Sequence, residues 1–151
     1  MKKVLIADDS KTFVKLLSSL LDEYLNEEFE IVSAKDGVDA LFELRDGEID
    51  ILFLDIIMPI VDGHGVAKYI ADRGLDLDVV IVTSTMDKEN IKGLGKLGIK
   101  YFLAKPVKYE KIEAVLNKIL FKNRPIPQDK LLKRKERNST LQDGDVCIIS
   151  E

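Results

Sequence analysis

The chain has 151 residues, of which 46% are hydrophobic and 33% charged, and this composition predicts one globular domain with an appendage. No apolar stretch approaches the ~20 residues that a membrane-spanning helix needs, and no hydrophobic leader opens the sequence, so we expect a cytoplasmic protein with no membrane contact. A single cysteine and a single histidine leave little for a metal site built on sulfur or imidazole.

The net charge of −4 is unevenly distributed along the chain. Residues 1–121 contain 16 Lys and Arg against 22 Asp and Glu and therefore carry −6, whereas residues 122–151 carry +2. Nucleic-acid backbones require clustered positive charge, so the first segment is a poor candidate for binding them. Any such contact is expected to come from the tail.

Five short apolar runs alternate with segments of helical periodicity. The runs are rich in Val, Ile and Leu without polar alternation, which is typical of strands buried on both faces; they cover residues 4–7, 29–34, 51–54, 79–82 and 101–104. The clearest helical faces are Phe13, Leu16, Leu17, Leu20 and Leu21; Val38, Leu41, Phe42 and Leu44; Val66, Ala67 and Ile70; Ile112, Val115, Leu116 and Ile119. Asp36 and Asp87 are placed to cap the second and fourth helices. This order predicts a doubly wound (βα)₅ α/β sandwich with a five-stranded parallel sheet.

Polar side chains follow four of the five predicted strands. Asp8 and Asp9 follow the first strand, Asp55 the third, Thr83 the fourth and Lys105 the fifth. The carboxyl ends of parallel strands meet at one edge of such a sheet, so these groups are expected to converge. Taken alone, each of these residues has an ordinary structural explanation; for example, the acidic pair could cap the first helix. Coincidence at four strand ends is a poorer explanation than one shared site.

The chemistry of this set favours phosphoryl transfer. Three carboxylates within a few ångströms cannot all stay ionised unless a cation compensates them. An all-oxygen site favours Mg²⁺, which binds carboxylates together with water and phosphate oxygens. A lysine and a threonine nearby would supply donors to phosphoryl oxygens, and an aspartate can itself form an acyl phosphate.

The segments VLIADDS, ILFLDIIMPIVDG, VVIVTS and YFLAKP, in this order and spacing, closely resemble the receiver domain of bacterial two-component response regulators. The resemblance covers residues 1–121 and implies a flavodoxin-like fold. It also implies that Asp55 accepts a phosphoryl group from a histidine kinase, and that the Lys-Pro bond after the fifth strand is cis. Mg²⁺ would be held by Asp9, Asp55 and the main-chain carbonyl of Ile57, with Asp8 acting through water.

The same resemblance implies a switch. Lys105 and Thr83 would hold the phosphoryl oxygens, and movement of Thr83 would free space for Phe102, which could equally be plain core. The response would appear on the face formed by the fourth helix, fifth strand and fifth helix, where a homodimer or another partner would bind. Gly93, with a second glycine two residues later, predicts a marginal, mobile fourth helix. Ile57 cannot orient an attacking water, which predicts slow loss of phosphate.

The tail, residues 122–151, departs from the family pattern. Pro125 and Pro127 are expected to end the fifth helix, followed by a short basic helix at 129–138 and an apolar, strand-prone run at 146–150. The tail could link to an output domain, or dock on the receiver or on another copy through its last strand. Direct binding of nucleic acid is a weaker third interpretation; the residues concerned are Lys130, Lys133, Arg134, Lys135 and Arg137.

We therefore expect a signalling phosphoprotein that controls a partner or output domain and assists its own phosphorylation and slow dephosphorylation, not a turnover enzyme. One alternative is a Mg²⁺-dependent phosphohydrolase with an aspartate nucleophile. Such enzymes usually place that nucleophile on the first strand as D-x-D, whereas this chain has an adjacent acidic pair and a separate Asp55. A second alternative is a receiver used only to bind proteins without phosphorylation, but the intact acidic set argues against it.

Overall fold

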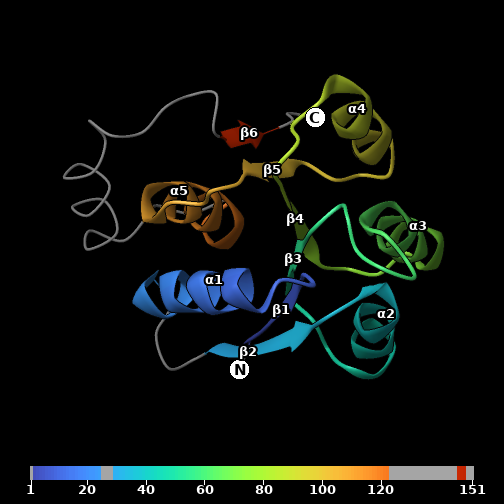
Figure 1. Cartoon of the computed structure of the whole chain (residues 1–151), viewed down its shortest axis with the longest axis horizontal. Coiled ribbons are helices and arrows are strands. Elements are labelled where there is room, and N and C mark those ends of the chain that lie inside the picture. The colour runs from blue at the N-terminus through green and yellow to red at the C-terminus, as the bar shows by residue number, and fades with distance from the viewer. Residues whose placement is uncertain (1, 25–28, 123–145, 149–151) are drawn as a thin grey trace.

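The computed structural model describes residues 2–24, 29–122 and 146–148 of the chain. Five strands and five helices alternate, and a short sixth strand follows (Figure 1). The strands are β1 (Lys2–Ala7), β2 (Phe29–Ala34), β3 (Ile51–Leu54), β4 (Asp78–Thr83), β5 (Tyr101–Ala104) and β6 (Val146–Ile148). The helices are α1 (Lys11–Tyr24), α2 (Gly37–Asp46), α3 (Gly63–Arg73), α4 (Lys88–Lys96) and α5 (Tyr109–Leu120). The predicted doubly wound (βα)₅ fold is confirmed.

The strands form one sheet in the order β2-β1-β3-β4-β5-β6. The first five are parallel, as predicted, and β6 adds an antiparallel strand to the edge of β5, with Cys147 opposite Phe102. Within the run expected at 146–150, Val146–Ile148 form a strand that pairs with β5, and residues 149–150 lie outside the described residues. The basic helix expected at 129–138 lies outside the described residues.

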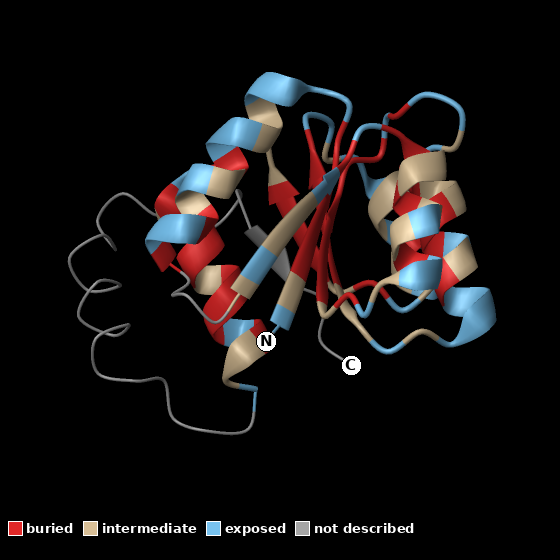
Figure 2. Ribbon diagram, turned by 90° about the horizontal axis from the view of Figure 1, so that it is seen from below, coloured by how far each residue is buried: buried red, intermediate tan, exposed pale blue. Residues whose placement is uncertain are grey.

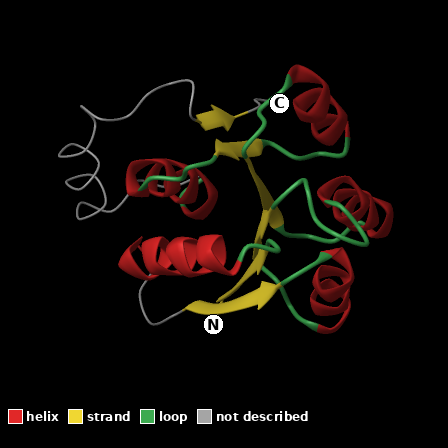
Figure 3. Cartoon of the chain, in the orientation of Figure 1, coloured by secondary structure: helices red, strands yellow, loops and turns green. Residues whose placement is uncertain are grey.

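Helices cover both faces of the sheet. Helices α1 and α5 lie on one face, and α2, α3 and α4 lie on the other (Figure 3). Each face has its own apolar core: Leu17, Leu21, Ile112 and Leu116 are among the residues of the first, and Ala40, Val66, Leu94 and Phe102 are among those of the second. Strands β1, β3, β4 and β5 are buried almost throughout, whereas β2 is only half-buried (Figure 2).

Three expectations about burial are wrong. Residues 29–34 were expected to be covered on both faces, but β2 is an edge strand that pairs only with β1. Leu16 and Phe42 were expected on the core faces of their helices, yet they are 45% and 52% exposed. The guanidinium of Arg45 lies 4.9 Å from the centre of the Phe42 ring and covers part of it, so this ring is accommodated at the surface.

Short polar residues fix the starts of four helices. Side-chain oxygens of Ser10, Asp36, Asp62 and Asp87 each accept a hydrogen bond from a backbone N–H in the first turn of the helix that follows. The caps expected at Asp36 and Asp87 are confirmed. In the described residues, no helix combines the length and apolar character that a bilayer span requires.

Candidate functional site

The first and third strands bring three carboxylates together. Asp8 and Asp55 directly follow β1 and β3, which are neighbours in the sheet, and the Asp55 N–H donates to the carbonyl of Ala7 at 3.0 Å. Asp8, Asp9 and Asp55 each offer a carboxylate oxygen within 4.8 Å of the others. Asp8 and Asp55 are buried, whereas Asp9 is exposed, so the cluster opens to solvent on one side.

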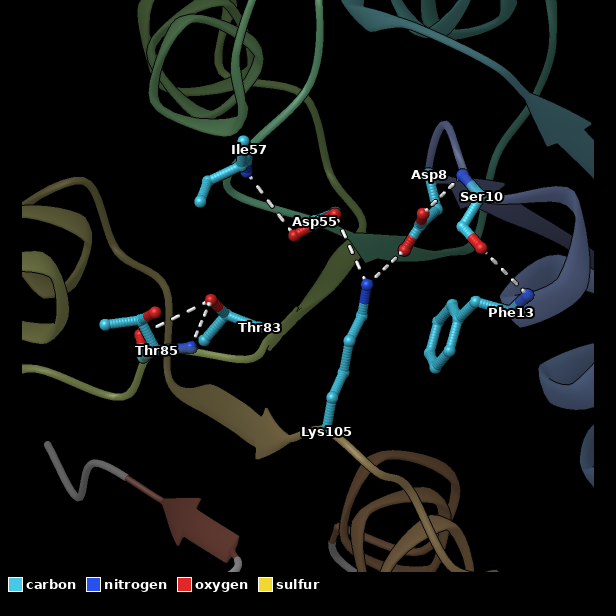
Figure 4. Close-up of polar contacts among 8 residues, drawn as sticks. All are labelled: Asp8, Ser10, Phe13, Asp55, Ile57, Thr83, Thr85 and Lys105. Atoms are coloured by element: carbon cyan, nitrogen blue, oxygen red, sulfur yellow. Dashed lines mark hydrogen bonds and ion pairs between the residues drawn. The ribbon is translucent and has the colours of Figure 1, made fainter.

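Lys105 connects this acidic cluster to the other half of the sheet. Its Nζ donates to Asp8 Oδ2 at 2.8 Å and to Asp55 Oδ2 at 3.3 Å (Figure 4). The ammonium also lies 4.2 Å from the centre of the Phe13 ring. The backbone N–H of Lys105 donates to the backbone carbonyl of Thr83 at 2.8 Å, and this bond joins the ends of β5 and β4. The Lys105–Pro106 peptide bond is cis, as the family resemblance implied.

The environment of Asp55 disfavours its negative charge. Burial raises the pKa of the Asp55 carboxyl, the nearby Lys105 ammonium lowers it, and the neighbouring Asp8 carboxylate raises it again, with a net shift upward. Its contacts are long: the Ile57 N–H donates to Oδ1 at 3.4 Å, and Lys105 reaches Oδ2 at 3.3 Å. One ammonium therefore incompletely compensates two buried carboxylates, and an additional cation would be favourable here.

The contacts of Asp8 and Ser10 show whether the acidic pair caps α1 or belongs to the site. Ser10 caps α1, because its Oγ accepts from the Phe13 N–H at 3.2 Å. Asp8 instead turns back, accepting from the Ser10 N–H at 2.8 Å through one oxygen and from Lys105 through the other. Capping is thus done by the serine, and the carboxylate of Asp8 belongs to the site.

Thr83 and Phe102 are both buried, with 2% and 1% exposure. The Thr83 hydroxyl accepts from the Thr85 N–H at 3.1 Å and donates to the Thr85 carbonyl at 3.3 Å, so it faces the loop that follows β4 (Figure 4). Phe102 packs in the core beneath α4, in the same apolar cluster as Leu94. Among the contacts of the described residues, the Thr83 hydroxyl is bonded to Thr85 and not to Asp55.

Sequence reasoning missed two contacts of the site. Phe13 packs against the core as expected from its face of α1, but its ring also lies against the Lys105 ammonium, and this contact was not predicted. Thr85 was not singled out, although its backbone holds the Thr83 hydroxyl. The only signal for Phe13 was its place in the first turn of α1, just after the acidic pair, and no signal pointed to Thr85.

The donor set of the cluster fits a hard divalent cation. The three acids present only carboxylate oxygens, and the described residues place no thiolate or imidazole ligand with them. Such oxygens suit Mg²⁺ or Ca²⁺ and are poor ligands for soft metals. Ile57 lies beside the cluster with its side chain 67% exposed.

Comparison with known proteins gives a consistent result. The family described as "Response regulator receiver domain" matches residues 4–117. The chemotaxis protein CheY of Halobacterium salinarum is 31% identical over 120 residues, which cover 79% of this chain and 97% of CheY. The alkaline phosphatase synthesis transcriptional regulatory protein PhoP of Bacillus subtilis is 27% identical over 151 residues, which cover 99% of this chain but only 61% of PhoP. Among solved structures, the CheX-CheY-BeF3-Mg+2 complex from Borrelia burgdorferi matches with a TM-score of 0.72 and 29% identity, over 79% of this chain and 89% of that one.

Proposed function

The chain belongs to the response regulator receiver domain family, and on that basis we propose that it is a phosphorylation switch whose phosphoacceptor is Asp55. The donor would be a histidine kinase or a small acyl phosphate. The observation that carries the proposal is the convergence of three carboxylates and one ammonium at the ends of β1, β3 and β5. Members of this family are response regulators and not turnover enzymes in the ordinary sense.

The proposed chemical step is an in-line transfer of the phosphoryl group to the Asp55 carboxylate. One carboxylate oxygen attacks the phosphorus, a P–O bond forms, and the bond from phosphorus to the donor breaks, with the electron pair leaving on the donor atom. The product is an acyl phosphate on Asp55 and a donor that recovers its proton from solvent. The long contacts of Asp55 leave its oxygens weakly engaged and available for this attack.

We propose that Mg²⁺ is the cofactor, because it binds one or two carboxylates together with water and phosphate oxygens. We propose that Asp9, Asp55 and the main-chain carbonyl of Ile57 hold it, with Asp8 acting through water. When bound, this cation neutralises the carboxylates and the charge that develops on the phosphoryl group. The matching complex from Borrelia burgdorferi contains Mg²⁺ with a beryllium fluoride, which supports this assignment by analogy.

Lys105 and Thr83 are proposed to hold the phosphoryl oxygens. Lys105 already donates to both buried carboxylates, so its ammonium needs only to exchange one acceptor for a phosphoryl oxygen. Thr83 must release Thr85 before its hydroxyl can reach the site. We propose that this movement passes to Phe102 and changes the surface formed by α4, β5 and α5.

The role of the tail is also a proposal. We assign residues 1–121 to the receiver and residues 122–151 to an extension, of which β6 docks on the receiver by pairing with β5. PhoP, a transcriptional regulatory protein, is longer than this chain, which suggests that a downstream protein or output domain receives the signal. A homodimer through the α4, β5 and α5 surface, or through the tail, would compete with docking of β6 for the edge of β5.

Incubation with acetyl phosphate and Mg²⁺ tests the proposed function. We expect one phosphoryl group per chain by intact mass, and none in Asp55→Asn or after removal of Mg²⁺ with EDTA. The Lys105→Met variant is expected to be labelled far more slowly. Continuous release of phosphate that exceeds the amount of protein would instead indicate a hydrolase, and absence of labelling would indicate a receiver used only to bind proteins.

A further inference from the structure

The structure contains a polar connection between α3 and α4. His64, in the first turn of α3, places Nε2 at 2.9 Å from Oδ1 of Asn90, in the first turn of α4. Within the described part of the chain, this is the one side-chain hydrogen bond that joins these two helices, which lie side by side on the same face of the sheet (Figure 1). The contact is partly buried and therefore partly protected from water.

The hydrogen bonds of Asn90 determine which group donates the proton. The Asn90 side-chain Nδ2 donates to Asp87 Oδ2 at 2.8 Å, and its backbone N–H donates to Asp87 Oδ1 at 2.8 Å. A carboxylate can only accept, so the amide oxygen of Asn90 is the atom left to face His64. His64 must therefore donate from Nε2–H. The result is a continuous chain from His64 through Asn90 to Asp87, the cap of α4.

One end of this chain adjoins the backbone of the proposed phosphoacceptor, and the other end, Asp87, follows Thr83 by four residues in the sequence. Gly63, directly before His64, donates its N–H to the Ile56 carbonyl at 2.7 Å, and a Cβ at position 63 would lie 2.5 Å from the carbonyl oxygen of Asp55. The start of α3 is thus packed on the backbone of the phosphoacceptor. At the other end, Asp87 follows the loop in which Thr83 is held by Thr85.

We propose that His64 is a positioning residue that holds the first turn of α4 in the resting position and so opposes movement of Thr83 toward Asp55. The inference rests on the proposed function. In this proposal, loss of the two bonds between Thr83 and Thr85 frees the loop that leads to Asp87, and the start of α4 moves with that loop. The bond from His64 to Asn90 favours the arrangement in which it is formed, so it weakens binding of any group that requires Thr83 to move.

The test measures affinity for beryllofluoride, a phosphoryl mimic, in saturating Mg²⁺, by ¹⁹F NMR on the full chain. His64→Phe keeps a ring but removes the donor, and we expect it to bind the mimic about two- to tenfold more tightly, the range that corresponds to loss of one hydrogen bond. The matched variant His64→Gln keeps an N–H donor and should behave like the unmodified chain. Thermal melts confirm that each variant is folded.

A double-mutant cycle separates positioning from a general effect on structure. In Thr83→Ala no hydroxyl has to leave Thr85, so adding His64→Phe to this background should change the affinity by less than twofold. Unchanged or weaker binding by His64→Phe alone would overturn the inference, as would tighter binding by His64→Gln. If the unmodified chain does not bind beryllofluoride at all, the phosphoacceptor role itself is contradicted. Binding that is insensitive to His64 contradicts only the inference.

Discussion

Ile60 has a backbone conformation that is costly for a β-branched residue. Its φ is 71°, and the Val61 N–H donates to the Pro59 carbonyl at 2.9 Å across it, which closes a tight γ-turn. The side chain is 79% exposed and gains little from packing. Glycine adopts this conformation freely, so Ile60→Gly is expected to raise the free energy of unfolding by about 1 kcal/mol.

Urea unfolding measures this effect, and Ile57→Gly is the matched control. Ile57 is also an exposed isoleucine in the same loop, but its φ is not positive, so glycine there should lower stability by roughly 0.5–1 kcal/mol. A lower free energy of unfolding in Ile60→Gly, as expected for Ile57→Gly, would refute the claim that Ile60 is strained.

Ile57 also bears on the lifetime of the acyl phosphate. Its side chain is 67% exposed beside Asp55, and it can neither donate nor accept a hydrogen bond to an attacking water. Ile57→Asn is therefore expected to speed autodephosphorylation severalfold, measured as loss of label after removal of acetyl phosphate. Ile57→Leu serves as the control and should leave the rate near that of the unmodified chain. An unchanged rate in Ile57→Asn would contradict the idea.

Individual site residues were predictable to different degrees. Asp8, Asp55 and Lys105 could be identified because each ends a strand, and strand ends in a parallel sheet meet at one edge. The contacts of Phe13 and Asn90 could not, because they depend on where a helix packs and on which rotamer its side chain adopts. Hydrophobic periodicity assigns a residue to a face of a helix, but it does not show which residues of that face lie beyond the core.

Helix α4 has two glycines among its nine residues, and glycine lowers helix propensity. Gly93 lies inside the helix, its φ is not positive, and a Cβ built on it would meet nothing within 4 Å. Gly93→Ala should therefore raise stability by roughly 0.5–1 kcal/mol and slow hydrogen exchange across α4. If α4 must move in signalling, the same change should also weaken binding of beryllofluoride.

Gly63→Ala is the contrasting substitution. A Cβ there would lie 2.5 Å from the Asp55 carbonyl oxygen and 2.7 Å from Ile56 Cα, both backbone atoms that cannot yield easily. We expect a loss of at least 2 kcal/mol, in the range found for forced overpacking. Equal changes in the free energy of unfolding for Gly63→Ala and Gly93→Ala would contradict the claim that position 63 is tightly packed and position 93 is open.

Strand bounds followed the apolar runs closely: β2, β3 and β5 match the predicted residues, β1 begins two residues earlier, and β4 extends one residue further at each end. Short apolar runs with polar ends leave few alternatives. The same reasoning failed for the burial of β2, since an apolar run does not reveal whether a strand lies at the edge or in the middle of a sheet. Strand order is set by crossover connections and packing, not by local sequence.

At the scale of the whole molecule, β6 converts β5 from an edge strand into an interior one. Deletion of residues 146–151 should therefore expose the edge of β5, and amide protons in Tyr101–Leu103 should exchange severalfold faster with deuterium. The opposite edge, β2, is the internal reference and should not change. Equal protection of β5 with and without these residues would show that β6 does not dock in solution.

The tail was the part of the chain least predictable from sequence. An apolar, strand-prone run at its end could have paired with this sheet, with another copy, or with an absent domain, and composition alone does not choose among them. The structure places Cys147 opposite Phe102, two residues before the end of β5. The strand on which the tail docks is therefore also the strand that leads to Lys105. Solution mass measured with and without beryllofluoride will show whether a second copy replaces β6.

The identity of the phosphorylated residue is the most direct test of the account. The chain is phosphorylated with acetyl phosphate and Mg²⁺ and treated with borohydride, which reduces an acyl phosphate to an alcohol, and its peptides are then mapped by mass spectrometry. The account predicts homoserine at position 55 alone, formed only when both reagents were present. Homoserine at position 8 or 9, or none at position 55 in a chain that has incorporated phosphate, would contradict it.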